Sequence, residues 1–259
     1  MKRFILLCAA TTLVAASTCA QGLTWESVTT GMGREHMSTF YYMPRMFKMS
    51  TSDGMDMIFL LDKQLIVNVD RNKKTYSEMT FGELEAGMKK VSGAMDAKMA
   101  ELREQMKGMP EEQRKMMEKM MGKMGGGDQG AISVEKTGEK KTVSGYACTK
   151  YIVSQGGDEI VTMWVTKDIA GFDAMRRDME EFGERMAALT PKFGKAMGEG
   201  MKKVDGFPMQ SETSGIISVV KTVDKRSTPL SEFSVPAGYT KVKSELDKGM
   251  EQLMHEGKN

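Results

Sequence analysis

Short segments in which apolar and polar residues alternate occur along most of the chain. Alternation with a period of two is typical of strands that bury one face. Turn-forming residues separate the segments, most clearly Ser52-Asp53-Gly54 and Gly156-Gly157-Asp158. Connections this short favour antiparallel neighbours. The pattern predicts a short edge strand within 233–242 and strands at 43–50, 55–61, 65–69, 75–79, 131–136, 140–145, 146–154, 159–167, 207–213 and 216–223.

Two stretches between these strands carry apolar residues every three or four positions, which places those residues on one face of a helix. The first stretch begins at Thr80, and Thr80 and Glu83 have the spacing of a capping box. The spacing predicts helical inserts at about 80–124 and 172–203. Both apolar stripes are rich in methionine: Leu84, Met88, Val91, Met95, Met99, Leu102, Met106 and Met109 in the first, and Phe172, Met175, Met179, Phe182, Met186 and Leu189 in the second.

Hairpins divided by two long helical inserts are typical of the α+β class. The predicted fold is a curved, largely antiparallel sheet, an unclosed half-barrel, covered by long Met-rich amphipathic helices. A straight helix over 80–107 would be about 42 Å long, so it must lie across the sheet or project from it. Its apolar stripe needs a partner, and we expect the concave face of the sheet to supply one. No clear linker divides residues 21–259, which we predict form one domain.

The first twenty residues have the pattern of a signal peptide. Lys2 and Arg3 precede an apolar run over 4–16, and small residues end in Ala20. We predict cleavage after Ala20, and acylation of Cys19 in a lipoprotein is the weaker alternative. No later segment is long and apolar enough to predict a transmembrane helix. The mature chain is therefore expected to be periplasmic or otherwise exported.

The charge balance argues against nucleic acid as a partner. The 259 residues carry a formal net charge of +2, and without Lys2 and Arg3 the basic and acidic residues balance at 35 each. A neutral chain offers no overall field for a polyanion. Cleavage would also leave Cys148 as the one cysteine, which cannot form an internal disulfide. We expect a buried strand cysteine, with an intermolecular bridge or a nucleophile as the alternatives.

Four motifs carry a resemblance to a known family: DRNKKTY at 70–76, SGYACTKY at 144–151, MWVTKDI at 163–169 and VPAGY at 235–239. The chain resembles exported bacterial proteins of the domain-of-unknown-function family numbered forty-four twelve. Its layout is also similar to the periplasmic lipoprotein-carrier fold of the outer-membrane lipoprotein localisation factor. That resemblance implies a half-barrel that holds acyl chains between its sheet and its helices. It implies no catalytic or binding residues for this chain.

Methionine is the most unusual feature of the composition, with 28 residues against two histidines. Methionine is flexible and polarizable, and Met-rich surfaces accommodate varied apolar partners. The leading prediction is a binding protein that holds a hydrophobic small molecule, a lipid or an acyl chain, between sheet and helices. Methionine stripes at helical spacing are also common in ordinary cores. The candidate lining residues are Phe59, Leu61, Trp164, Met179, Phe182 and Met186.

The sequence also bears on three other functions. Thioether ligands suit Cu(I), and Met116, Met120 and Met124 recur at helical spacing, so a copper-binding protein is one alternative. A chaperone or interaction protein with an envelope protein client is another, marked by a wide apolar surface. The sequence contains no G-x-S-x-G, H-E-x-x-H, C-x-x-C or P-loop motif. We therefore predict a protein without enzymatic activity and without a cofactor.

Overall fold

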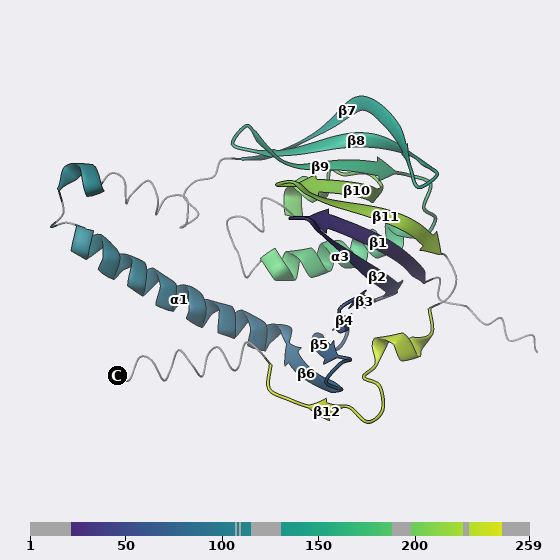
Figure 1. Cartoon of the computed structure of the whole chain (residues 1–259), viewed down its shortest axis with the longest axis horizontal. Helices are drawn as coiled ribbons and strands as arrows, with labels where there is room; N and C mark the ends of the chain where they lie inside the picture. Colours follow the sequence, from purple (N-terminus) through teal and green to yellow (C-terminus); the bar gives the residue numbers. More distant parts are fainter. Residues whose placement is uncertain are drawn as a thin grey trace, which may run out of the picture.

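A twelve-stranded sheet forms the body of the protein over the described residues (Figure 1). The computed structural model describes residues 22–106, 108, 110–114, 131–187, 198–224 and 228–244. The strands are β1 (Leu23–Gly31), β2 (Arg34–Met43), β3 (Met46–Thr51), β4 (Met55–Leu60), β5 (Leu65–Asp70), β6 (Thr75–Thr80), β7 (Ile132–Val143), β8 (Tyr146–Gln155), β9 (Asp158–Thr166), β10 (Phe207–Thr213), β11 (Ile216–Asp224) and β12 (Thr240–Lys241).

The strands lie in the order β12-β6-β5-β4-β3-β2-β1-β11-β10-β9-β8-β7. All neighbours are antiparallel except β12, which runs parallel to β6. Because β12 and β7 stand at opposite edges, the sheet does not close on itself. The predicted α+β class and the unclosed, largely antiparallel sheet are thus confirmed.

The sequence pattern does not predict the hairpin of β1 and β2. Met32 and Gly33 form its turn, with φ angles of 51° and 73°. A turn with two residues in the left-handed region is usually marked by Asn-Gly or Asp-Gly, and methionine in the first place hides the signal. The hairpin is central to the sheet because β1 joins the N-terminal meander to β11.

The predicted turn at Gly138-Glu139 is wrong, because β7 is a single strand with an irregularity there. Lys136 lies opposite Tyr151 and Lys140 lies opposite Thr149, so β7 has extra residues at this point. The hydroxyl of Thr137 accepts a hydrogen bond from the amide of Glu139 at 3.1 Å and donates one to the backbone carbonyl of Lys150 on β8 at 3.3 Å. These bonds hold the extra residues as a bulge within the strand.

Helix α1 (Phe81–Met106) begins where it was predicted but does not cover the sheet. The capping box is confirmed, since the Thr80 amide donates to Glu83 at 2.7 Å and the Glu83 amide donates to the Thr80 hydroxyl at 3.1 Å. In Figure 1, α1 runs outward from the end of β6. Without a connecting loop between β6 and α1, the helix cannot turn back over the strands. Residues 111–114 are helical again, and 115–124 lie outside the described residues.

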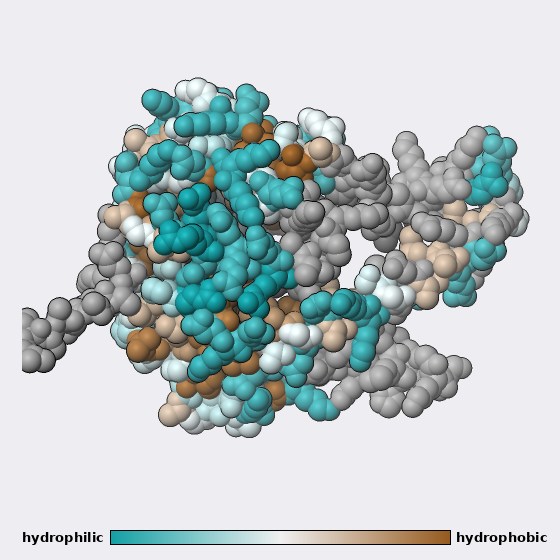
Figure 2. Space-filling model, turned by 180° about the vertical axis from the view of Figure 1, so that it is seen from behind, coloured by the Kyte–Doolittle hydropathy of each residue, from teal (hydrophilic) through white to brown (hydrophobic). Residues whose placement is uncertain are grey.

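Helix α3 (Phe172–Ala187) does cross the sheet, as predicted for the second insert. Residues 198–201 are helical as well, and 188–197 lie outside the described residues. Figure 2 shows a hydrophilic band across the middle of the reverse face, where α3 lies in Figure 1, with hydrophobic residues on both sides of it. Among the described residues, no helix has both the length and the apolar character needed to cross a membrane.

The opposite face of the N-terminal strands is covered by the C-terminal segment. Phe233, in the short 3-10 helix η1 (Leu230–Phe233), packs on Ile58 and Val67 of β4 and β5. Lys48 of β3 lies near the buried Asp56 at 3.4 Å and bonds Glu232 of η1 at 2.8 Å. The C-terminal segment and α3 therefore lie on opposite faces of the N-terminal strands.

Candidate functional site

Helix α3 packs on the sheet through apolar contacts near both of its ends. Met175 is 1% exposed and joins a core cluster that includes Phe207 and Met209 of β10. Phe172 meets Phe207 edge to face at 5.5 Å between ring centroids. Near the other end, Phe182 meets Phe59 of β4 at 4.8 Å. The helix therefore spans strands from both halves of the sheet.

A polar contact lies between these two apolar ones. The carboxylate of Asp178 accepts a hydrogen bond from the phenol of Tyr42 at 3.0 Å and another from the backbone amide of Arg45 at 2.8 Å. The guanidinium of Arg45 donates a hydrogen bond to Glu181, which lies one helical turn beyond Asp178. It donates another to Asp62 at 2.8 Å. The side chain of Arg45, in the turn between β2 and β3, thereby ties α3 to the N-terminal strands.

The backbone of Arg45 is strained. Its φ is 68°, in the left-handed region that glycine or asparagine usually occupies at this kind of turn. In this conformation its amide reaches Asp178 and its guanidinium reaches Glu181, both on α3. A strained residue that makes several specific contacts points to a constraint on how α3 sits on the sheet.

The charges at this contact shift the pKa of two groups. Burial, together with the hydrogen bond to Asp178, raises the pKa of the Tyr42 phenol above its usual range. The hydrogen bond from Arg45 lowers the pKa of the Glu181 carboxyl. At neutral pH, Tyr42 is therefore a proton donor and Glu181 an anion, which are the states that the contact needs.

We expect the Tyr42 contact to weaken at alkaline pH. A group whose pKa is raised on folding contributes stability that is present below its unfolded pKa, about 10 for tyrosine, and is lost as the pH rises through the folded value. Above about pH 10, the free energy of unfolding should fall more steeply for the native protein than for Tyr42→Phe. Urea unfolding at a series of pH values measures both slopes. Equal slopes would show that the phenol is not perturbed.

Between α3 and the start of α1, part of the sheet carries a patch of half-buried apolar side chains, here called the aromatic surface. Phe47, Phe59 and Ile66 are directly opposite one another on β3, β4 and β5, so they share a face. The rings of Phe81 and Phe182 lie 6.0 Å apart at the edge of this row. The aromatic surface comprises the partly buried Phe47, Met57, Phe59, Leu84 and Phe182, which pack on the buried Leu61, Ile66 and Phe81. The Arg185 guanidinium lies over the ring of Phe81 at 5.8 Å, at the edge of this apolar surface.

The structure brings together three of the six predicted lining residues. Phe59, Leu61 and Phe182 belong to the aromatic surface or lie directly beneath it. Trp164 lies apart, packed on the cluster of Met175 and covered by the ammonium of Lys141 at 4.1 Å from its ring centre. Met179 is 47% exposed. The side chain of Met186 lies outside the described residues.

Several residues of this site were not found from the sequence. Tyr42, Arg45 and Asp178 meet only because a turn of the sheet faces α3, and the sequence separations of 133 and 136 residues hide that. The signal that could have found them is Asp178 itself, a carboxylate beside the apolar stripe of an amphipathic helix. The proposed copper ligands Met116, Met120 and Met124 lie outside the described residues. Within the described residues, no three His, Cys, Asp or Glu side chains gather as a metal site.

Cys148 of β8 is 2% exposed and forms no disulfide. Its thiol donates to the carbonyl of Tyr146 at 3.4 Å, and burial raises the pKa of the thiol. A raised pKa disfavours the nucleophilic thiolate. Both observations agree with the prediction of a cysteine that packs within a strand.

Comparison with known families identifies the group to which the chain belongs. Residues 83–239, more than half of the chain, match the family described as Domain of unknown function (DUF4412). The chain belongs to this family. The resemblance drawn from the four sequence motifs is thus confirmed. No curated protein matches the sequence.

Solved structures of MucB are similar to the DUF4412 chain in outline. MucB in complex with MucA(peri) gives a TM-score of 0.39 at 8% identity, covering 86% of this chain and 57% of that one. The Pseudomonas aeruginosa MucA/MucB complex gives a TM-score of 0.41 at 7% identity. This match covers 87% of this chain and 60% of that one. This chain therefore spans less than two thirds of the length of those proteins. Similarity at this level assigns no function.

Proposed function

We propose that this DUF4412 protein is an exported, non-enzymatic binding protein that holds a hydrophobic ligand, such as a lipid or acyl chain, on the aromatic surface. The observation that carries the proposal is the row of Phe47, Phe59 and Phe182, which stays only partly buried between α3 and the start of α1. Burying aromatic rings against an acyl chain is favourable by about 25 cal/mol for each Å² of apolar surface removed from water.

The arrangement of the two helices supports this proposal. α3 crosses the sheet and is fixed at Met175 and Asp178, while α1 starts at the other side of the aromatic surface and runs outward. The surface therefore lies between the two helices, and Phe182 of α3 reaches Phe81 of α1 beside it at 6.0 Å. Phenylalanine and methionine side chains can adjust to a flexible chain without leaving buried polar groups unpaired.

Ligand binding is tested with the mature chain and a fatty acid whose fluorescence rises in apolar surroundings. We expect saturable binding that Phe59→Gln weakens by about tenfold, because a buried aromatic contact is lost. Leu230→Gln is the matched control. Leu230 is 66% exposed and lies in η1, which packs on the opposite face of the sheet, so binding should not change.

Native mass spectrometry of protein isolated from its own cell envelope provides the second measurement. We expect an acyl-chain molecule that is released on denaturation. Thermal unfolding of Phe59→Gln shows whether that variant keeps its fold. A native protein that arrives empty and takes up no fluorescent fatty acid would rule out the lipid function. A bound polypeptide in place of lipid would do the same and would favour a protein client.

A further inference from the structure

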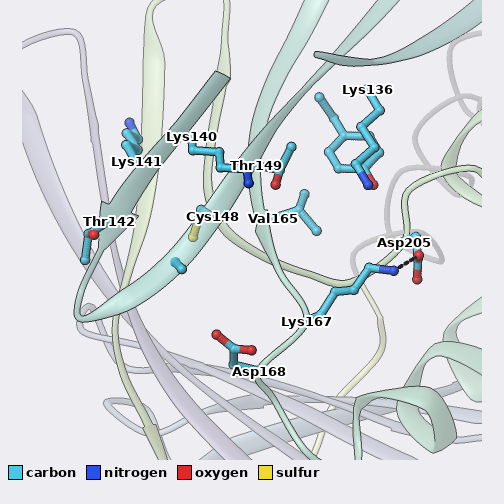
Figure 3. Close-up of a pocket in the computed structure, with 12 residues that line it drawn as sticks. Lys136, Lys140, Lys141, Thr142, Cys148, Thr149, Val165, Lys167, Asp168 and Asp205 are labelled. Atoms are coloured by element: carbon cyan, nitrogen blue, oxygen red, sulfur yellow. Dashed lines mark hydrogen bonds and ion pairs between the residues drawn. The ribbon is translucent and has the colours of Figure 1, made fainter. Parts of the chain in front are cut away.

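A cavity lies at the other end of the sheet, between the β7–β8 hairpin and β9, and shares no residue with the aromatic surface. Its volume is about 520 Å³. Cys148, Tyr151 and Val165 are among its buried lining residues, and Thr142 and Thr149 add hydroxyl groups. Four lysines and two aspartates also line the cavity: Lys136, Lys140, Lys141, Lys167, Asp168 and Asp205 (Figure 3).

The bulge in β7 gathers two of these lysines. In a regular strand, Lys136 and Lys140 would be about 13 Å apart, because each residue advances the chain by about 3.3 Å. Here they lie opposite Tyr151 and Thr149 on β8, two residues and therefore about 7 Å apart along that strand. The bulge therefore shortens the spacing between the two lysines, which remain on the same side of the hairpin.

The strand pairing of β7, β8 and β9 determines which side chains form the floor of the cavity. Lys140 is opposite Thr149, and Thr149 is opposite Val165 of β9, so these three side chains share a face. In Figure 3 they converge at the centre of the cavity, and Lys167 and Asp205, joined by a dashed line, close one side.

The positive charge of the cavity is only partly neutralised. Lys167 forms an ion pair with Asp205. Lys141 donates to Gln210 at 2.9 Å and lies over the ring of Trp164. In the part of the chain that the structure describes, Lys136 and Lys140 have no ion-pair partner. Neighbouring like charges destabilise a sheet, and an anion held between them would remove that cost.

We propose that this cavity binds a phosphate group through Lys136, Lys140 and the hydroxyl of Thr149. A phosphate carries up to two negative charges and several acceptor oxygens, which suit two separate ammonium groups and a hydroxyl donor. The group can belong to a soluble phosphate compound or to the headgroup of a phospholipid.

The test uses the mature chain, inorganic phosphate and vesicles of phosphatidylglycerol in phosphatidylcholine. Calorimetric titration and vesicle sedimentation should show binding that the double variant Lys136→Met/Lys140→Met weakens by about tenfold or more, since charged hydrogen bonds are lost. Phosphate binding without vesicle binding identifies a site for soluble phosphate compounds, whereas vesicle binding that depends on the same two lysines identifies the lipid headgroup. The double variant Lys136→Arg/Lys140→Arg keeps both charges and should keep most of the binding.

Lys150→Met is the matched control. Lys150 lies on the same hairpin but does not line the cavity and is paired with Glu139 at 3.1 Å, so its loss should leave binding nearly unchanged. Thermal unfolding gives a separate readout. Without phosphate, Lys136→Met/Lys140→Met should melt at the same temperature as the native protein or higher, because repulsion is removed. Binding that is absent from the native protein, or equal in native protein and double Met variant, would overturn the proposal.

Discussion

Met175→Ala should lower the free energy of unfolding by about 2–5 kcal/mol, the range found when a buried methionine is truncated to alanine. Met175 is 1% exposed and packs among Phe207, Met209 and Cys148, so truncation leaves a cavity at the contact between α3 and the sheet. Urea unfolding followed by circular dichroism measures the change.

Met179→Ala is the control for this prediction, because it makes the same change one turn further along the same helix. Met179 is exposed, and alanine is the better helix former, so the free energy of unfolding should stay within about 0.5 kcal/mol of the native value. An equal loss of unfolding free energy for Met175→Ala and Met179→Ala would mean that Met175 does not face the sheet and that α3 is rotated about its axis.

Asp178→Ala should destabilise the protein by about 2–3 kcal/mol. The change leaves the phenol of Tyr42 and the amide of Arg45 without their acceptor in a partly buried place, and an unpaired buried donor costs more than a hydrogen bond contributes. The same unfolding experiment measures this loss. We also expect fatty-acid binding to weaken, because α3, which contributes Phe182 to the aromatic surface, would no longer be fixed.

Asp173→Ala removes a carboxylate from the same helix at a position where the side chain is 83% exposed. Asp173 has one weak contact, to Arg176 at 3.8 Å, and exposed pairs of this kind contribute little. Asp173 also lies in the first turn of α3, where a carboxylate contributes at most about 1 kcal/mol, so its loss should cost clearly less than that of Asp178. A loss as large as that of Asp178→Ala would show that helix charge, and not the contact with the sheet, holds α3.

Met175 and Asp178 also show what could not be predicted about α3 from the sequence. The apolar stripe of α3 contains Met175, Met179 and Phe182, and spacing alone treats these residues as equal. In the folded protein, Met175 is buried, Met179 is exposed, and the acidic Asp178 faces the sheet. The reason is local to the sheet: the phenol of Tyr42 and the amide of Arg45 need an acceptor there, so the helix turns its carboxylate toward them.

The same limit applies to β7. The Gly138-Glu139 pair is a reasonable turn signal, yet the hydroxyl of Thr137 and the pairing with β8 keep the strand continuous. A bulge and a turn use the same residue types, and only the partner strand decides between them. The cavity with Lys136 and Lys140 therefore could not be found before the register was known.

The sequence by itself determined the features that depend on neighbouring residues: the period of two in the strands, the capping box at Thr80 and Glu83, the amphipathic helices and the family motifs. Tertiary structure alone decided which helix covers the sheet, which side of α3 is buried, and where aromatic rings and unpaired lysines gather. The physical reason is distance along the chain. Local hydrogen bonds and periodicity are written within a few residues, whereas Arg45 and Asp178, or Phe59 and Phe182, become neighbours only when the whole sheet has formed.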